Sequence, residues 1–331
     1  MVAQIDPLYR RAGLGPTWVR ILSWALFEGR PLTTRGRWFN PIVLALHHLH
    51  CRLPRPAPVE APIFVAGMGR SGTTLLGKIL SLHPRVGFLN EPKALWHVAV
   101  GREDIVGSYQ RGPARYRLDP DDATPETRRR LERLFAAYLR WTGRRRVVDK
   151  SPEVVYRADF VRAIFPRARL LYPVRNGWAV CRSVERWSTR HRRTVGDEVH
   201  DWWGADRRKW RLLVEQLAAR EPDLEPAAAE LATLEDQRQM AALEWILTSR
   251  HAARQLERSA DILPVRYEEL TASPLATIAS VLEFCHLPSD ERVDAYCRDA
   301  VRPAEPARPF ALPEALEEPF QRALEQWGYD A

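Results

Sequence analysis

The amino-acid sequence predicts an α/β fold, a three-layer α/β/α sandwich around a central parallel sheet. Short apolar segments that begin near residues 62, 86, 146, 169 and 262 are typical of buried strands. Segments with apolar residues at helical spacing separate them, and strands that alternate with helices favour a parallel sheet. With 331 residues and 45% hydrophobic content, the chain is long enough to bury a large core.

Residues 1–60 are predicted to form a helical extension, and residues 61–331 the main domain. Apolar residues at helical spacing predict helices over 18–26 and 42–49, with a polar turn at 30–39 and a proline-rich linker at 53–62. We expect the extension to pack on the main domain; formation of a homodimer or contact with a membrane surface is the alternative. His47, His48 and His50 lie on the second helix, but no fourth metal ligand is near them.

The rest of the chain is predicted to be mostly helical. Helices are expected over 125–141, 199–220, 227–259 and 275–285, and the middle two form a helical insertion around 196–259. Residues 101–124 are expected to be a loop near the entrance of a ligand site, and residues 261–270 a strand. Most of the tryptophans should pack in the core, although some could line a ligand pocket.

The stretch at 61–81, APIFVAGMGRSGTTLLGKILS, joins a strand to a helix through a glycine-bearing loop. Residues 63–66 predict a buried strand, Gly67 to Gly72 the loop, and Thr73 and Thr74 the start of an amphipathic helix. Backbone N–H groups and the positive end of the helix dipole would then meet in one concavity, which predicts an anion site. A turn in which Arg70 is merely solvated is the alternative.

This loop differs from that of a nucleotide triphosphatase. The spacing of Gly67 and Gly72 matches a phosphate-binding loop, but Thr73 stands where such enzymes carry the lysine that reaches β- and γ-phosphates. The cation lies inside the loop, at Arg70, whose planar fork suits a shorter phosphate-like group. The sequence therefore argues against hydrolysis of ATP or GTP.

A second strand, over 86–89, leads directly to a carboxylate. Ligands of open parallel sheets lie beyond the carboxyl ends of the strands, so Glu91 should face the same crevice as Arg70. A carboxylate there can take the proton of an attacking hydroxyl. His97, about one and a half helical turns further on, is the alternative base, and a surface ion pair with Lys93 is the non-catalytic alternative for Glu91.

Two later strands also end beside polar residues. Asp149 could mimic the metal-binding acid of a triphosphatase, but the missing loop lysine argues against this. Arg175 follows the strand at 170–174, Asn176 can cap the next helix, and Ser183 lies on that helix. An arginine fork with a hydroxyl suits a phosphomonoester, whereas a structural salt bridge is the alternative for Arg175. Two anion sites on one sheet imply a nucleoside with phosphate groups at both ends.

These segments together resemble the sulfotransferase family, especially the bacterial and Golgi members that include tyrosylprotein sulfotransferases. IFVAGMGRSGTTLL at 63–76 resembles the family's 5′-phosphosulfate loop, DKSP at 149–152 its lysine segment, and RYEEL at 266–270 its RYEDL segment. The resemblance covers about 61 to 287 and implies a P-loop-like sulfotransferase fold. It also implies the donor 3′-phosphoadenosine 5′-phosphosulfate (PAPS), the product adenosine 3′,5′-bisphosphate (PAP), and no metal.

The resemblance further implies roles for individual residues. Glu91 occupies the place of the catalytic glutamate of tyrosylprotein sulfotransferases, although cytosolic sulfotransferases use a histidine, which keeps His97 as the alternative. Lys150 matches a lysine that contacts the sulfuryl group in transfer, and Arg70 would assist it. The residues that would bind the donor are Arg70, Ser71, Gly72, Thr73 and Thr74 at the 5′-phosphosulfate, Arg175 and Ser183 at the 3′-phosphate, and Tyr267 against the adenine or as a brace of the sheet.

Composition agrees with an anionic ligand and argues against nucleic acid as a partner. The net charge of +8 favours anions, but no basic ribbon interleaved with aromatic residues indicates nucleic acid. Neither a secretory signal nor an apolar run of ~20 residues is visible, so we expect no membrane span and a cytoplasmic protein. Cysteines without metal-ligand spacing should be reduced thiols: Cys51, Cys181, Cys285 and Cys297.

The sequence thus predicts a PAPS-dependent sulfotransferase. It would transfer the sulfuryl group in line, without metal, to a hydroxyl, or less readily an amine, of a small-molecule, glycan or peptide acceptor. A P-loop kinase or other nucleoside-phosphate transferase is the second hypothesis, and dependence on magnesium would distinguish it. A binding module without catalytic activity is the third.

Overall fold

The computed structural model describes residues 4–54, 57–304 and 306–329. At its centre is a parallel five-stranded sheet in the order β2-β3-β1-β4-β8. All five predicted strands are confirmed: β1 (Ile63–Val65), β2 (Val86–Asn90), β3 (Arg146–Lys150), β4 (Arg169–Val174) and β8 (Ile262–Arg266). The chain leaves the central strand β1 first toward one edge and later toward the other, which opens a crevice at the carboxyl ends of the strands.

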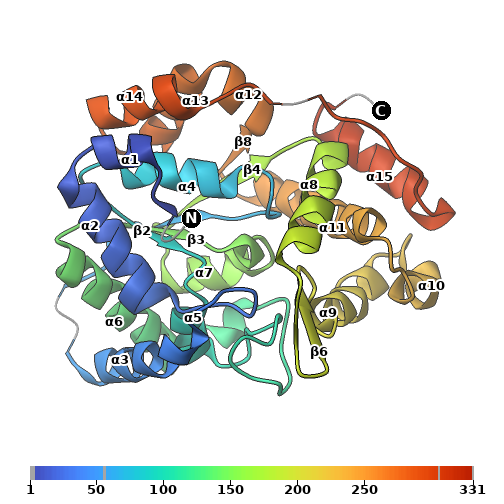
Figure 1. Cartoon of the computed structure of the whole chain (residues 1–331), viewed down its shortest axis with the longest axis horizontal. Helices are drawn as coiled ribbons and strands as arrows, with labels where there is room; N and C mark the ends of the chain where they lie inside the picture. Colours follow the sequence, from blue (N-terminus) through green and yellow to red (C-terminus); the bar gives the residue numbers. More distant parts are fainter. Residues whose placement is uncertain (1–3, 55–56, 305, 330–331) are drawn as a thin grey trace.

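Helices cover both faces of this sheet (Figure 1). Alternate residues of β1 point to opposite faces, so that Ile63 and Val65 pack with Ile79 whereas Phe64 packs with Phe135. The first face is covered by α4 (Thr73–Ser81), α12 (Tyr267–Ala272), α13 (Pro274–Phe284) and α14 (Glu291–Ala300). The second is covered by α5 (Lys93–Val100), α6 (Pro125–Thr142), α7 (Ala158–Ile164), α8 (Gly177–His191), α11 (Gln237–Arg258) and α15 (Glu314–Gln326). The predicted three-layer architecture is confirmed.

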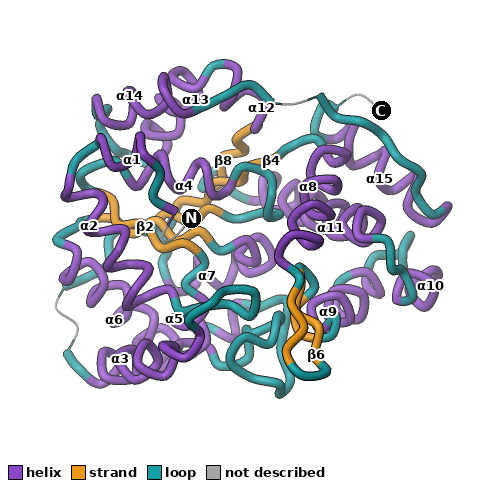
Figure 2. Tube along the Cα trace, viewed as in Figure 1, coloured by secondary structure: helices purple, strands orange, loops and turns teal. Residues whose placement is uncertain are grey.

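The prediction for 199–220 is wrong in its first half. A small antiparallel sheet lies there, apart from the main sheet (Figure 2), with strands β5 (Arg193–Val195), β6 (Glu198–Asp201) and β7 (Gly204–Ala205). Gly196, with φ 61°, allows the tight turn between β5 and β6, and Gly204 approaches the backbone so closely that a Cβ would lie 2.7 Å from the carbonyl oxygen of Val106. Helix α9 (Arg208–Gln216) follows.

Two further boundaries differ from prediction. The expected helix over 227–259 is split into α10 (Ala228–Ala232) and α11, because the Asp236 carboxylate caps α11 by accepting the N–H groups of Arg238 and Gln239. The strand expected through 270 ends at Arg266, and Tyr267 begins α12.

The N-terminal segment packs on the main domain. It consists of α1 (Pro7–Arg11), α2 (Leu14–Leu22), which continues into a π-helical turn η2 (Ser23–Glu28), and α3 (Asn40–Arg52). Apolar periodicity did not reveal the short α1, which Asp6 caps through the N–H of Tyr9. Asp6 also forms an ion pair with Lys78 on α4.

An ion pair of this segment covers the open edge of the sheet. β2 is an edge strand, so some of its backbone groups have no neighbouring strand. Arg20 Nη1 donates to the carbonyl oxygen of Phe88 at 2.6 Å, and Glu28 Oε1 accepts the backbone N–H of Asn90 at 2.6 Å. Since Arg20 and Glu28 also pair with each other, they take the place of the peptide group that a neighbouring strand would supply.

Candidate active site

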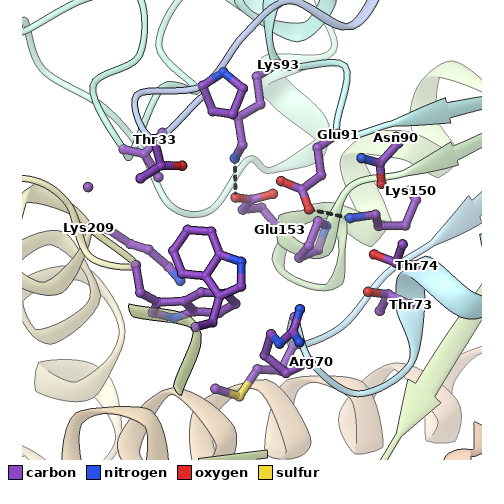
Figure 3. A pocket seen from close by; sticks show the side chains of 18 of the residues that line it. Thr33, Arg70, Thr73, Thr74, Asn90, Glu91, Lys93, Lys150, Glu153 and Lys209 are labelled. Carbon is purple, nitrogen blue, oxygen red and sulfur yellow. Dashed lines mark hydrogen bonds and ion pairs between the residues drawn. The ribbon is translucent and has the colours of Figure 1, made fainter. Parts of the chain in front are cut away.

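A cavity of about 440 Å³ lies beyond the carboxyl ends of β1, β2 and β3 (Figure 3). Its other walls come from the N-terminal segment, the small sheet and α11. Five of the residues singled out in the sequence meet here: Arg70, Thr73 and Thr74 after β1, Glu91 after β2, and Lys150 at the end of β3. Parallel strands bring these distant segments to one edge of the sheet.

The loop after β1 leads to a helix start that no side chain caps. Gly72, with φ 92°, is the N-cap residue of α4, and no side chain caps this helix start. The first N–H groups of α4 are therefore available to a ligand, as is the positive end of the helix dipole. Arg70, with φ 72°, adopts the left-handed conformation that non-glycine residues adopt rarely and that clusters at functional sites.

Glu91 and Lys150 form an ion pair at the centre of the cavity. The Lys150 side chain is 2% exposed and that of Glu91 36%, so the carboxylate is the accessible member. Glu91 has φ 50°, and its N–H donates to the carbonyl oxygen of Lys150 at 2.8 Å. Burial raises the pKa of Glu91, but the positive charges of Lys150 and Lys93 outweigh it and lower the net pKa. The carboxylate is therefore ionised and able to accept a proton.

Neither alternative to Glu91 as the base is supported. The alternative of a surface ion pair between Glu91 and Lys93 is wrong, because Lys93 pairs with Glu153 at 2.7 Å, also in the cavity wall. His97 is not among the cavity-lining residues; its ring stacks on Tyr109 with centroids 5.3 Å apart, and burial lowers its pKa. Of the two candidate bases, only Glu91 faces the cavity among the described residues.

Asp149 lies behind this site rather than in it. The side chain is fully buried, and its oxygens accept Trp96 Nε1–H at 2.8 Å and the Ser151 hydroxyl at 2.6 Å. Burial raises the pKa of Asp149 to about 7. Because both oxygens face protein donors, Asp149 anchors the end of β3, and a metal-binding role is not favoured.

Arg175 and Ser183 lie next to the loop, although neither lines the cavity. Arg70 Nε donates to Ser183 Oγ at 3.1 Å, and Arg175 Nη1 donates to the carbonyl oxygen of Arg70 at 3.3 Å. Burial lowers the pKa of Arg70, and the nearby charge of Arg175 lowers it further. Within the described part of the chain neither arginine forms an ion pair, so this corner carries positive charge that an anion would neutralise.

Tyr267 packs against Arg175 and Gly72. The Arg175 guanidinium lies 4.4 Å from the centre of the Tyr267 ring, and a Cβ on Gly72 would approach that ring to 2.4 Å. The predicted cap is confirmed, since the Asn176 side chain accepts the N–H of Trp178 at 3.0 Å. The Nε atom of Arg175 is buried and has no hydrogen-bond partner among the described residues, which leaves a donor for a ligand.

Sequence reasoning missed the part of the cavity wall that comes from the small sheet, α9 and α11. There Lys209 pairs with Glu244 at 2.5 Å, and Trp202 Nε1 donates to Glu244 Oε2 at 2.8 Å. The Trp202 ring contacts the loop so closely that a Cβ on Gly69 would lie 2.5 Å from it. One signal could have indicated this wall: the sequence has only four lysines, and three of them, at positions 93, 150 and 209, line the cavity.

The chain is similar to several known proteins. A family model described as the sulfotransferase family matches residues 62–291. The chain is 29% identical over 140 residues to the nodulation protein NoeE of Sinorhizobium fredii, which is 39% of this chain and 32% of that protein. It is 24% identical over 296 residues to an uncharacterized protein of Aquifex aeolicus, 82% of this chain and 31% of that one. The chain thus spans about a third of the length of these curated relatives.

Solved structures share the fold. The crystal structure of sulfotransferase STF9 from Mycobacterium avium matches with a TM-score of 0.50 at 18% identity. The match covers 98% of this chain and 93% of that chain, and at this identity it concerns the fold alone.

Proposed function

This chain belongs to the sulfotransferase family, and we propose that it transfers the sulfuryl group of PAPS to an acceptor hydroxyl. One observation carries the proposal: an anion loop and an ionised carboxylate paired with a buried lysine meet in one cavity. The acceptor is a small molecule, a glycan or a peptide group that can enter this cavity.

The residues present fit the donor. Arg70 and the uncapped start of α4 suit the 5′-phosphosulfate, with Thr73 and Thr74 as hydroxyl donors. Arg175 and Ser183 suit the 3′-phosphate, because a guanidinium and a hydroxyl lie beside the loop and the Arg175 Nε is without a partner within the described residues. Ser71, which is 2% exposed, and Gly72 contribute backbone groups to the loop. The packing of Tyr267 under Arg175 favours its role as a brace.

Glu91 and Lys150 would carry the chemistry. The acceptor proton passes to the Glu91 carboxylate while the acceptor oxygen bonds to sulfur and the bond from sulfur to the bridging oxygen breaks, releasing PAP. The ammonium of Lys150 has three N–H donors, of which Glu91 uses one, so others can stabilise charge on the departing oxygen. Arg70 adds positive charge at the same end of the cavity.

Fixed side-chain cations would do the work that magnesium does in a kinase. The loop has Thr73 where a kinase of this loop type needs lysine, and Asp149 is enclosed by Trp96 and Ser151. We therefore favour transfer without metal over a kinase.

The test combines binding and turnover. Calorimetry should show PAP binding that is unchanged by a chelator, and labelled PAPS should pass its sulfuryl group to a member of a panel of sugar, phenol, peptide and lipid hydroxyls. Glu91→Gln should keep PAP affinity and lose at least about 100-fold in turnover, with His97→Asn as the matched control that retains activity. Tight ATP binding that requires magnesium, without affinity for PAP, would refute the proposal.

A further inference from the structure

Helix α2 buries its charged residue and exposes its apolar residues, which is the reverse of an ordinary surface helix. Its single charged residue, Arg20, is 1% exposed, whereas Leu14, Trp18 and Ile21 are 88%, 65% and 38% exposed. These three residues are spaced i, i+4 and i+7 and share one face of the helix. Surface helices normally present their charged face to water and bury the apolar one. The outer face of α2 is therefore apolar.

Helix α3 also exposes large apolar residues while it buries two histidines. His47 and His50 are 0% and 5% exposed, whereas Ile42 and Leu49 are both 52% exposed. Burial lowers the pKa of His47 to about 4, and its Nε2–H donates to the carbonyl oxygen of Phe27 at 3.0 Å, so this imidazole is held neutral inside. Two histidines of α3 are therefore buried, whereas Ile42 and Leu49 face outward beside the exposed His48 and Arg52.

These exposed apolar residues are concentrated in one part of the molecule. Figure 1 shows α2 and α3 on the same side, and α3 packs against η2, the continuation of α2. Trp38, which precedes α3, is 79% exposed, and Trp141 lies against His50 of α3 and is 48% exposed. Of the ten large apolar residues exposed in the described chain, seven fall between 14 and 53: Leu14, Trp18, Ile21, Trp38, Ile42, Leu49 and Leu53. So dense a set marks an interaction surface.

The charge of residues 7–59 indicates which kind of partner this apolar surface binds. The only carboxylate between residues 7 and 59 is Glu28, which is 4% exposed and paired with Arg20. The exposed charges around the apolar residues are those of arginines: Arg10, Arg11, Arg35 and Arg52. A second copy of the chain would bring two positive faces together, whereas an anionic surface complements them.

We propose that the outer faces of α2 and α3, together with Trp38, dock on an anionic phospholipid surface. Tryptophan with arginine and aliphatic residues, and without exposed acids, is the composition of helices that lie in the membrane interface. No helix in the described part of the chain is long and apolar enough to cross a membrane, and α2 and α3 have 9 and 13 residues. In this proposal α2 and α3 lie on the bilayer surface. The proposal is independent of the proposed catalytic function.

The test is flotation of the full chain with vesicles. Binding should be strong with about 30% phosphatidylglycerol in phosphatidylcholine and weak with phosphatidylcholine alone. Binding to the anionic vesicles should weaken as the salt concentration is raised from about 0.05 to 0.5 M. Trp18→Ser combined with Trp38→Ser should weaken binding at least about tenfold, since both rings are exposed and would enter the interface. The matched control combines Val195→Ser with Leu275→Ser, which alters exposed apolar residues elsewhere and should leave vesicle binding unchanged.

Two results would overturn the proposal. One is the absence of binding to any vesicle by a chain that still unfolds cooperatively. The other is a concentration-dependent dimer that Trp18→Ser with Trp38→Ser dissociates, because this face would then be covered by a second copy. Unchanged unfolding temperatures in both double variants would show that the loss of binding is not a loss of fold.

Discussion

Replacing Glu28 tests whether the N-terminal segment positions the proposed base. The carboxylate accepts the N–H of Asn90, the residue directly before Glu91, and pairs with Arg20, whose side chain is 1% exposed. Glu28→Ala leaves this buried guanidinium without its carboxylate and the Asn90 N–H without an acceptor. Removing one partner of a buried pair costs about 3–5 kcal/mol, which is a fall in Tm of roughly 5–10 °C in a chain of this size.

The effect on turnover follows from the backbone. Glu91 is held by β3 on one side, through its N–H to Lys150, and by Glu28 on the other side, through Asn90. If one support is removed, a shift of about 1 Å at the carboxylate is expected to cost on the order of 10–100-fold in kcat. The Kd for PAP should stay within about twofold, because the donor loop follows a different strand.

The assay compares matched variants at a temperature where all are folded. Glu221→Ala removes a carboxylate that is likewise buried and paired, with Arg254 at 2.6 Å and Arg250 at 3.4 Å. Glu221 lies in the chain between α9 and α10, and Figure 1 shows these helices across the molecule from β2. It should lower Tm but not kcat. Glu28→Gln keeps an oxygen for the Asn90 N–H and should recover most of kcat. Equal loss of Tm in Glu28→Ala and Glu221→Ala with full kcat in both would refute a positioning role.

Three other predictions follow from the site. Lys150→Met should lower kcat at least about 100-fold and move the acidic limb of the pH–rate profile upward, because a cation that lowers the pKa of the proposed base, Glu91, is lost. An unmoved limb would contradict this. The pKa of Asp149 is raised to about 7 in the folded state. Between about pH 4 and 7 the folded chain therefore holds a proton on Asp149 that the unfolded chain has lost. The contribution of Asp149 to the free energy of unfolding should fall as pH rises through that window. Urea unfolding at about pH 5 and 8 measures this fall in the free energy of unfolding, which should be smaller for Asp149→Asn than for the parent chain. An equal fall in both chains would contradict the raised pKa of Asp149. Gly72→Ala places a Cβ 2.4 Å from Tyr267 at φ 92° and should weaken PAP binding at least about tenfold by calorimetry, whereas Gly112→Ala, with no atom within 4 Å, should not.

The parts of the site that the sequence predicted share one property. Arg70, Glu91 and Lys150 each lie at or directly after the carboxyl end of a strand, and a parallel sheet brings all such ends to one edge. The strands themselves were predictable because they are apolar segments bounded by glycine, proline or charged residues. Local pattern and one topological rule were therefore sufficient to assemble the anion loop, the carboxylate and the lysine.

The parts of the structure that the sequence did not predict depend on pairs of residues that are distant in sequence. Arg20 and Glu28 reach the backbone of β2 from more than 60 residues away, and Lys209 on α9 pairs with Glu244 on α11. A single chain gives no local sign of such partners, since a buried charge is visible only once its surroundings are known. The inverted polarity of α2 escaped for the same reason, because periodicity identifies a helix but not which face is buried.

The charges of the cavity wall divide the site into two halves. Its three lysines are each paired with a glutamate, and Arg20 is paired with Glu28; Arg70 is the one cation of the wall without a carboxylate partner in the described chain. Positive charge that is not compensated is thus confined to the loop and to the neighbouring Arg175, whereas the opposite wall offers polar groups with little net attraction for an anion. Such an arrangement would orient the proposed donor by its phosphates and leave the remaining space to an acceptor that need not be charged.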